Sequence, residues 1–261
     1  MRILLEISFL GTGFCGWQVQ PNGRTVQGVM TETSAFLFGA PCRVTGCSRT
    51  DSGVHALSFY CTAETDREAC PVPLEKIPRA YSALLPPDIA VRRAFPAPDG
   101  FHPRYSALEK EYVYRVRTAP VPDPFGFSRE CFFPSPLSPD GIGRMREAGA
   151  ALRGRHDFSA FMAAGSKITD PVRTVSFCEV RSDPDGQTLE IDVAADGFLY
   201  HMVRIISGTL LEIGRGVRSP DTVAALLRSG DRKGAGPTAP ACGLYLKRVK
   251  YPAGVLPPDK I

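Results

Sequence analysis

Residues 2–9 read Arg-Ile-Leu-Leu-Glu-Ile-Ser-Phe, and this stretch opens the chain with a two-residue periodicity. Ile3, Leu5, Ile7 and Phe9 fall on one face, so the spacing predicts a β-strand with one better-buried side. Further patterns predict a helix, two strands, a helix and a strand at about 25–37, 43–45, 57–62, 74–85 and 89–94. The resulting order, β-α-β-β-α-β, is typical of a ferredoxin-like fold.

The second half of the chain repeats this scheme. Its predicted strands cover 111–117, 174–180 and 188–193, and its predicted helices cover 139–152 and about 199–213. Between the halves, residues 95–103 are rich in proline, glycine and aspartate, which favours a connecting loop. We therefore expect an α+β protein of two ferredoxin-like (RRM-like) domains, residues 1–105 and residues 106–261.

Two helices carry explicit start signals. Residues 138–140 and 219–221 both read Ser-Pro-Asp, which supplies an N-cap serine, a proline at the first helical position and an acidic first turn. Gly154 and Gly230 suit the C-terminal ends of these helices. Thr25 is the expected N-cap of the first helix in the chain.

Composition excludes several classes of protein. The chain has 261 residues, of which 43% are hydrophobic and 22% charged, as in an ordinary globular protein. It has no apolar run of membrane-spanning length, and Glu6 interrupts the first apolar stretch too early for a signal peptide, so we expect a cytoplasmic location. The eight cysteines are scattered without metal-ligand spacing, which predicts reduced, mostly buried thiols and no metal site. A net charge of +4 neither requires nor excludes a nucleic-acid partner.

The segment Gly11-Thr-Gly-Phe-Cys-Gly16 matches the G-x-G-x-x-G pattern of dinucleotide-binding proteins. That function needs a helix to begin at the glycines so that its N-terminus faces a pyrophosphate. Pro21 and the turn pair Asn22-Gly23 follow instead, so we expect no nucleotide cofactor.

Residues 46–56 read Gly-Cys-Ser-Arg-Thr-Asp-Ser-Gly-Val-His-Ala and lie between two predicted strands. A hairpin with an ordinary Asx-type turn would account for Asp-Ser-Gly without any function. Alternatively, Arg49 would hold the Asp51 carboxylate ionised at neutral pH, which is the state that a nucleophile needs.

The segment Arg49-Thr-Asp-x-Gly-Val-His-Ala56 resembles the active-site signature of the tRNA pseudouridine synthase A family. Other segments resemble that family in order and spacing across nearly the whole chain: residues 11–20, 25–27, 85–91, 101–107, 156–158, 201–204 and 243–245. The resemblance implies a pseudouridine synthase fold, with a mixed central sheet, helices on the outer faces and a basic cleft between the domains. It also implies an isomerase that converts uridines at positions 38 to 40 of the tRNA anticodon stem-loop, works as a homodimer and needs no cofactor.

The resemblance also assigns roles to individual residues. Asp51 resembles the nucleophile, and Arg49 resembles the residue that binds RNA and fills the space of a flipped base. Tyr112 resembles the tyrosine that stacks on the target base, and Arg204 resembles the arginine that orients the aspartate by a charge-assisted hydrogen bond. Two further residues are candidates for a supporting role: His55 and His201.

The residues themselves leave alternatives open for two of these sites. Tyr112, Tyr114 and Val116 share one strand face, so the residues alone favour Tyr112 as a core aromatic. Arg204 points away from the apolar stripe of its predicted helix, as any exposed arginine would. That stripe consists of Met202, Ile205, Ile206, Thr209 and Ile213.

The chemistry also leaves questions open. Asp51 would either attack the ribose covalently or remove a ribose proton to give a glycal, and Tyr112 is a candidate for taking the proton from C5. Basic side chains proposed to follow the RNA backbone are Arg24, Arg104, Lys110, Arg144 and Arg155.

Three positions depart from the family pattern: Leu10, Ser82 and Tyr200. Leu10 replaces a usual aspartate, which leaves the hydrogen bonding of the first loop in question. Two other functions are weighed against the family reading. A non-catalytic RNA-binding module would display RNP-type aromatics on its strands, and a glycosidase-like hydrolase would pair Asp51 with a second carboxylate; neither feature is found.

Overall fold

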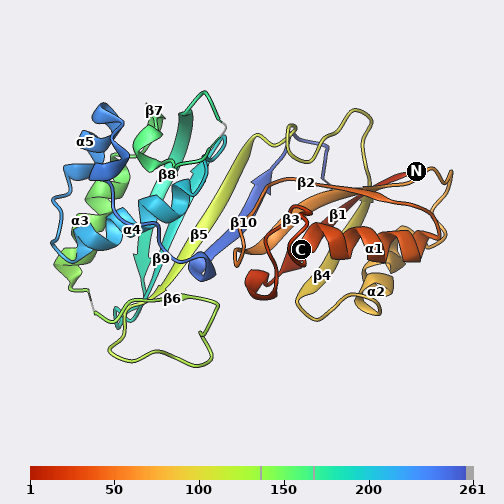
Figure 1. Ribbon diagram of the computed structural model, residues 1–261, viewed down its shortest axis with the longest axis horizontal. Coiled ribbons are helices and arrows are strands. Elements are labelled where there is room, and N and C mark those ends of the chain that lie inside the picture. The colour runs from red at the N-terminus through yellow and green to blue at the C-terminus, as the bar shows by residue number, and fades with distance from the viewer. Residues whose placement is uncertain (136, 167, 257–261) are drawn as a thin grey trace. The chain divides into compact units, whose positions relative to one another are not determined.

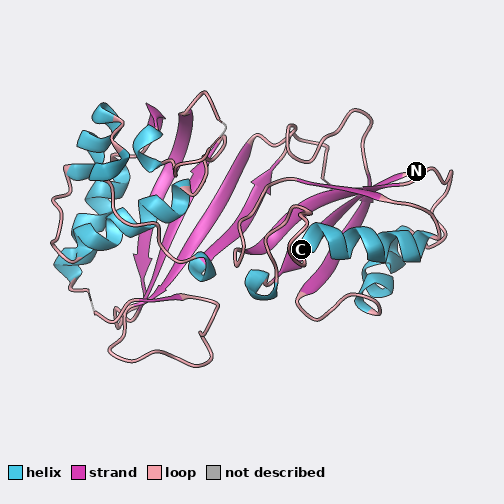
Figure 2. Ribbon diagram, in the orientation of Figure 1, coloured by secondary structure: helices cyan, strands magenta, loops and turns pink. Residues whose placement is uncertain are grey.

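The computed structural model describes residues 1–135, 137–166 and 168–256. The chain forms two compact units, of which unit 1 comprises Met1–Leu108 and the chain from Leu246 onward, and unit 2 comprises Glu109–Tyr245. Helices and strands occur in both units, which makes the protein α+β (Figure 2). Among the described residues, no helix has the length and apolar character needed to cross a membrane.

Unit 1 has the element order predicted for the first half. Its strands are β1 (Arg2–Phe9), β2 (Arg43–Gly46), β3 (His55–Glu64) and β4 (Ile89–Pro96), and its α-helices are α1 (Val26–Phe38) and α2 (Ile77–Ser82). β1 lies antiparallel between β3 and β4, and β2 pairs antiparallel with β3. The strand order β4-β1-β3-β2 is that of two interleaved β-α-β units, as in ferredoxin-like folds.

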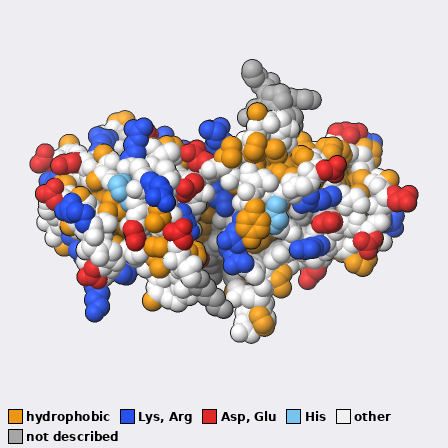
Figure 3. Space-filling model, turned by 90° about the horizontal axis from the view of Figure 1, so that it is seen from above, with side chains coloured by type: hydrophobic (Ala, Val, Ile, Leu, Met, Phe, Trp, Pro, Cys, Tyr) orange, Lys and Arg blue, Asp and Glu red, His pale blue; other side chains and the backbone are white. Residues whose placement is uncertain are grey.

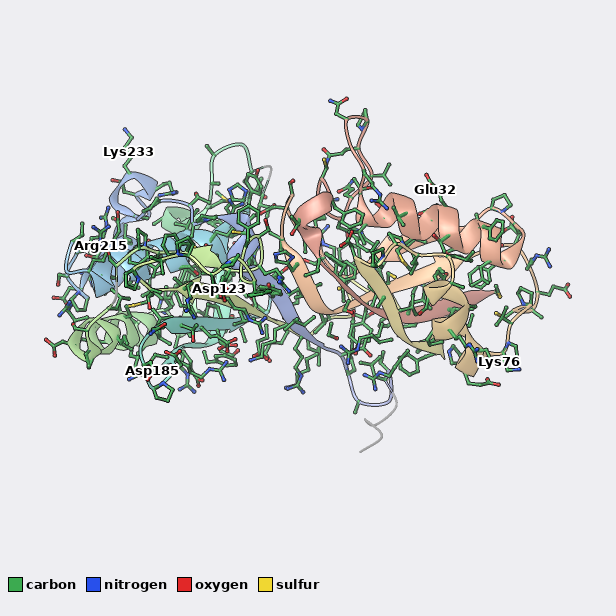
Figure 4. The ribbon with its side chains drawn as sticks, turned by 90° about the horizontal axis from the view of Figure 1, so that it is seen from below. Glu32, Lys76, Asp123, Asp185, Arg215 and Lys233 are labelled. Carbon is green, nitrogen blue, oxygen red and sulfur yellow. The ribbon has the colours of Figure 1, made fainter. Side chains whose placement is uncertain are left out.

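Local signals account for the helices of unit 1. Thr25 is the N-cap of α1 and its side chain accepts a hydrogen bond from the amide of Gly28, as predicted. Pro78 lies in the first turn of α2, where a proline costs no helical hydrogen bond. The two helices are linked in the core, where the hydroxyls of Ser34 and Tyr81 lie 2.6 Å apart. Figure 1 shows α1 in front of the strands of this unit, and Figure 4 shows Glu32 on its outer side.

The strand β1 has the better-buried face predicted for it, but much of its other face is buried as well. Ile3, Ile7 and Phe9 are buried, but Glu6 on the opposite face is only 7% exposed. Arg93 forms an ion pair with the Glu6 carboxylate, and Ser58 donates a hydrogen bond to it at 2.9 Å. A buried charge is tolerated when it is paired and hydrogen-bonded in this way.

In unit 2, four strands of the sheet follow one another in the order β5-β9-β8-β7. Its strands are β5 (Glu109–Arg117), β6 (Cys131–Phe132), β7 (Gly154–Asp157), β8 (Val172–Ser182) and β9 (Thr188–Ala195). β5, β9, β8 and β7 are successively antiparallel, whereas the short β6 is parallel to β5, which makes the sheet mixed. Figure 1 shows the helices of this unit gathered beside its strands: α3 (Pro139–Ala150), α4 (Met202–Gly214) and α5 (Thr222–Ser229).

The helix signals in unit 2 were only partly correct. Ser138 caps α3 as predicted, and Gly230 ends α5 with a left-handed φ of 66°. However, α5 begins at Thr222 because Ser219 and Pro220 form a preceding turn, with Thr222 donating to the Ser219 carbonyl. Gly154 does not cap α3, which ends at Ala150; its φ of 112° serves the start of β7 instead.

The compact units are divided after Leu108 and again after Tyr245, whereas the domains expected from the sequence are residues 1–105 and 106–261. The chain from Leu246 onward returns to unit 1, where β10 (Leu244–Lys250) extends the sheet beyond β3. Tyr251 then packs edge-on against Tyr60, with ring centroids 5.4 Å apart. The amide of Leu108 donates to the carbonyl of Lys250 at 2.8 Å. These are long-range contacts, so local composition around residue 105 could not reveal them.

Candidate active site

The turn that carries Asp51 connects β2 to β3 in unit 1. Asp51 is half-buried, and its carbonyl accepts a hydrogen bond from the amide of Val54 at 3.2 Å. Gly53 has a φ of 79°, which suits glycine at this turn position. Arg49, two residues earlier, is exposed. The segment is therefore a tight turn closed through the backbone, and the aspartate that the resemblance assigns as nucleophile is its first residue.

A second loop, residues 10–17, holds this turn through its backbone. The amide of Trp17 donates to the carbonyl of Thr50 at 3.1 Å. The Phe14 carbonyl accepts a bond of 3.2 Å from the hydroxyl of Ser52, and the amide of Gly53 lies 3.4 Å from the same oxygen. Backbone hydrogen bonds position a turn more firmly than side-chain contacts alone, since the backbone groups cannot change rotamer.

Two glycines of this loop, Gly11 and Gly16, allow this close approach. A Cβ atom on Gly11 would overlap the carbonyl oxygen of Val54. A Cβ on Gly16, whose φ is 80°, would lie 2.5 Å from the carbonyl oxygen of Thr50. Gly11–Gly13 form a single 3-10 turn, and no α-helix begins there, since α1 starts at Val26. The structure thus agrees with rejecting the dinucleotide-binding pattern.

His55 supports the same arrangement from inside the core. It is fully buried, and its Nδ1 accepts a hydrogen bond from the amide of Gly11 at 2.9 Å. Acceptance at Nδ1 requires the neutral tautomer with the proton on Nε2. Burial therefore gives His55 a structural function, tying the Asp51 turn to the first loop. Leu10 stands where the family usually has an aspartate. Its amide donates a hydrogen bond to the Asp88 carbonyl at 2.9 Å, which anchors the loop without an aspartate side chain.

Thr50 is a residue of this turn that sequence reasoning missed. It is only 8% exposed, and within the described part of the chain its hydroxyl has no hydrogen-bond partner. A buried hydroxyl without a partner is unfavourable in a free protein, and such groups recur at functional sites. Thr50 precedes Asp51 directly, which makes it a further candidate for contact with substrate.

Tyr112 lies on β5 in unit 2, opposite Val193 of β9. It is 7% exposed, and its ring meets the ring of Phe198 edge-on, with centroids 5.0 Å apart. Phe198 belongs to the connection between β9 and α4 and was not singled out from the sequence. The neighbouring Tyr114 is a core residue with its hydroxyl bonded to the Pro240 carbonyl at 2.8 Å.

Arg204 lies on α4, and a strap of residues 235–240 holds it. The Nε of Arg204 donates to the carbonyl of Ala239 at 2.8 Å, and the amide of Ala239 donates to the carbonyl of Arg204 at 3.1 Å. The side chain is half-buried, whereas the predicted apolar stripe, Met202, Ile205, Ile206, Thr209 and Ile213, is buried throughout. The helical geometry expected from the sequence is thus confirmed.

His201 occupies a special position at the start of α4. It is the N-cap residue with a φ of 60°, and its carbonyl accepts the amide of Ile205 at 3.0 Å. A non-glycine residue in the left-handed region is uncommon and costs free energy, so it is found mainly where surrounding contacts impose it. Its ring stacks on that of Tyr200, with centroids 3.8 Å apart. Tyr200 therefore substitutes a stacking partner for the usual polar residue.

The structure distributes the predicted site residues between the units. Arg49, Asp51 and His55 belong to unit 1, whereas Tyr112, His201 and Arg204 belong to unit 2. Within the described ranges, no group of three or more His, Cys, Asp or Glu side chains is arranged to hold a metal ion. All eight cysteines are free thiols, four of them buried, and burial raises the pKa of Cys178 to about 12.

Comparison with known proteins agrees with the family resemblance found in the sequence. A family model described as tRNA pseudouridine synthase matches residues 148–252. A tRNA pseudouridine synthase A of Bacillus velezensis is 45% identical over 253 residues, which are 96% of this chain and 99% of that protein. The Bacillus subtilis protein of that name is 44% identical with the same coverage. That of Geobacillus kaustophilus is 45% identical and covers 96% of this chain and 94% of its own.

Among solved structures, one titled a Cbf5-Nop10-Gar1 complex aligns with 94% of this chain and 48% of its own. Its identity of 13% and TM-score of 0.39 are too low to add to the assignment. The similarity to these relatives extends over nearly the full chain, since each of the three covers 96% of it. The chain belongs to the tRNA pseudouridine synthase A family.

Proposed function

We propose that this chain converts uridine to pseudouridine in the anticodon stem-loop of tRNAs, at the family's positions 38 to 40, with Asp51 as the reactive carboxylate. One observation carries the proposal. A half-buried aspartate sits in a turn that backbone hydrogen bonds and close glycine contacts hold, in a chain 45% identical to a tRNA pseudouridine synthase A over 96% of its length. Rigid placement is what a nucleophile requires, since misplacement by about 1 Å can cost about a hundredfold in rate.

The reaction is an isomerisation that balances without a co-reactant. The bond between N1 of the base and C1′ of the ribose breaks, the base turns, and C5 bonds to C1′. C5 then loses its proton, and N1 gains one. Asp51 either attacks C1′ to form a covalent intermediate or removes a ribose proton to give a glycal. In both routes the carboxylate acts in its ionised form, and no cofactor is consumed.

The target uridine lies in a stem and must leave the base stack before Asp51 can reach its sugar. Extrusion costs roughly a few kcal/mol, which stacking and edge hydrogen bonds in the site must offset. We assign the stacking to Tyr112, whose ring Phe198 orients, and the filling of the vacated space to the exposed Arg49. Arg204 is proposed to orient the Asp51 carboxylate, and its backbone-anchored Nε supports a fixed guanidinium.

The basic residues proposed to follow the RNA differ in their surroundings. Arg144 donates to the Gly214 carbonyl at 3.0 Å and so caps the C-terminal end of α4, which favours a structural role. Arg24 and Arg155 are exposed and remain candidates for phosphate contacts. Figure 4 shows another exposed cation of unit 2, Lys233, pointing away from that unit. We further propose that the enzyme acts in the cytoplasm as a homodimer, following its family.

Substitution of the carboxylate tests the proposal. Asp51→Asn removes the charge but keeps the size of the side chain, so we expect release of tritium from 5-labelled uridine in tRNA to be abolished while tRNA binding survives. Asp66→Asn, at an exposed aspartate of the same unit, is the matched control and should retain activity. Persisting activity of the Asp51 variant would remove this residue from the chemistry, and joint loss of binding would indicate a structural role for the turn.

A further inference from the structure

A tight turn of residues 102–106 presents an aromatic side chain to solvent on unit 1. Tyr105 is 76% exposed. The turn is closed at its ends, because the amide of Ser106 donates to the His102 carbonyl at 2.9 Å and the amide of His102 donates to Oγ of Ser106 at 3.1 Å. Inside the turn, Nδ1 of His102 accepts the amides of Arg104 at 3.1 Å and Tyr105 at 3.3 Å. The backbone that carries Tyr105 is therefore held in a single conformation.

Two neighbouring side chains orient the ring without covering it. The imidazole of His102 lies 4.4 Å from the Tyr105 ring, centroid to centroid, with the planes inclined by 35°. The guanidinium of Arg104 lies 5.7 Å from the same centroid, within the range of a cation–π contact. Because most of the tyrosine remains exposed, a planar group can still stack on it.

The surroundings of the turn are basic. Burial and then the positive charge of Arg2 lower the pKa of His102, with smaller contributions from Arg104 and Arg43. The ring is therefore neutral at pH 7, as its acceptor function at Nδ1 requires. Among acidic groups, Glu64 lies 4.0 Å from Arg2 and offsets part of this charge. Figure 3 shows, on unit 1, a histidine beside an exposed hydrophobic side chain, with Lys and Arg side chains on either side.

We propose that the His102–Ser106 turn is a second RNA-binding surface, on which Tyr105 stacks against an unpaired nucleobase of the tRNA while Arg104 contacts the adjacent phosphate. An exposed, oriented aromatic ring beside arginines is the combination that single-stranded and looped RNA binds, because every base has a stacking face and every nucleotide a phosphate. The inference rests on the proposed function for the identity of the RNA. It adds a contact outside the residues assigned to the chemistry.

The binding of unmodified tRNA to Tyr105 variants tests the inference. Stacking of one base is worth a change in affinity of roughly fivefold to a hundredfold. We expect Tyr105→Ala and Tyr105→Leu to weaken tRNA binding by about tenfold or more. Tyr105→Phe, which keeps the ring, should bind like the wild type. Phe36→Ala is the matched control, because Phe36 is an equally exposed aromatic of unit 1, at 75%, and lies on α1. It should leave tRNA affinity unchanged.

Two further measurements separate this inference from the proposed function and from self-association. At saturating tRNA, the single-turnover rate of Tyr105→Leu should equal that of the wild type. The whole effect should lie in the tRNA concentration that gives half of this rate. Arg104→Ala should reduce the slope of log affinity against log salt by about 1. Wild-type affinity of Tyr105→Leu would overturn the inference, as would a change in its sedimentation that accounts for the lost binding. If the wild-type protein does not isomerise uridine in tRNA, the proposed function is overturned instead.

Discussion

At the scale of single residues, the Asp51 turn depends on two glycines that have no side chain. Gly11 and Gly16 let the backbone of the first loop approach the carbonyls of Val54 and Thr50 more closely than any side chain would permit. His55 then fixes the approach by accepting the amide of Gly11. The backbone of the Asp51 turn is therefore held by close main-chain contacts, and small changes in the supporting loop should shift the residue proposed for the chemistry.

Gly11→Ala tests this dependence. The new methyl group would overlap the Val54 carbonyl, so the turn must shift or the loop must separate from it. Overpacking of this kind costs about 1–3 kcal/mol. We expect lower thermal stability and at least a tenfold loss of kcat in the tritium-release assay, by analogy with the cost of small misplacements.

Gly13→Ala is the control for this substitution, because it lies in the same 3-10 turn and its Cβ would meet nothing within 4 Å. It should retain the activity and the stability of the wild type. Equal behaviour of the two variants would show that close packing under the turn does not position Asp51.

At the scale of elements, α4 is the helix that carries Arg204, the arginine proposed to orient the Asp51 carboxylate. The strap of residues 235–240 crosses the helix so closely that a Cβ on Gly208 would overlap the Pro237 carbonyl. The amide of Gly236 also donates to Oγ1 of Thr209 at 2.9 Å. The helix and its strap thus form one packed element, and Arg204 is held where the two meet.

The N-cap of α3 offers a test of helix stability separate from catalysis. Oγ of Ser138 accepts the amide of Gly141 at 3.1 Å, and α3 packs on α4 through the contact of Gly141 with the Gly214 backbone. Ser138→Ala should lower the free energy of unfolding by about 1 kcal/mol, measured by urea denaturation. Ser138→Asp, which keeps an acceptor at the helix N-terminus, should stay close to the wild type. An unchanged midpoint for Ser138→Ala would mean that the cap does not contribute.

At the scale of the whole molecule, unit 1 is built from both ends of the sequence. Its sheet begins with β1 and is extended by β10, more than two hundred residues later in the chain. Tyr251 joins these parts, since its ring packs on Tyr60 and Phe101 and its hydroxyl donates to the Pro103 carbonyl at 2.7 Å. The unit that carries Asp51 therefore needs the C-terminal segment to complete its core.

The free energy of unfolding of Tyr251→Ala tests this dependence. Removal of a buried aromatic ring costs about 3–5 kcal/mol, whereas Tyr251→Phe loses one hydrogen bond and about 1 kcal/mol. We expect hydrogen exchange in Tyr251→Ala to accelerate first at the amides of β3, in unit 1, and not at those of β9. Uniform acceleration in the strands of both units would show that the segment contributes to global stability only.

The order of elements in unit 1 was predictable from the sequence, because alternation, helical spacing and capping residues are local properties. In unit 2 the longer strands and the helices were predicted, but the strands β6 and β7 were not, and neither was β10. β1, α1 and the N-cap of α3 follow such signals. The candidate residues Asp51, Tyr112 and Arg204 were also found from local motifs, together with the family resemblance. Thr50 and Phe198 were missed, because their environments produce no periodic pattern in the sequence. The buried Thr50 hydroxyl has no partner among the described residues, and Phe198 contacts the Tyr112 ring across the fold.

The sequence by itself determined which segments become strands and helices, and it determined the family. Only the tertiary structure decided that the chain from Leu246 onward completes unit 1, that both faces of β1 are buried, and that His55 supports a turn from within the core. The physical reason is the range of the interactions. Backbone preferences act over a few residues, whereas burial and close backbone contacts join segments that the sequence separates by tens or hundreds of positions.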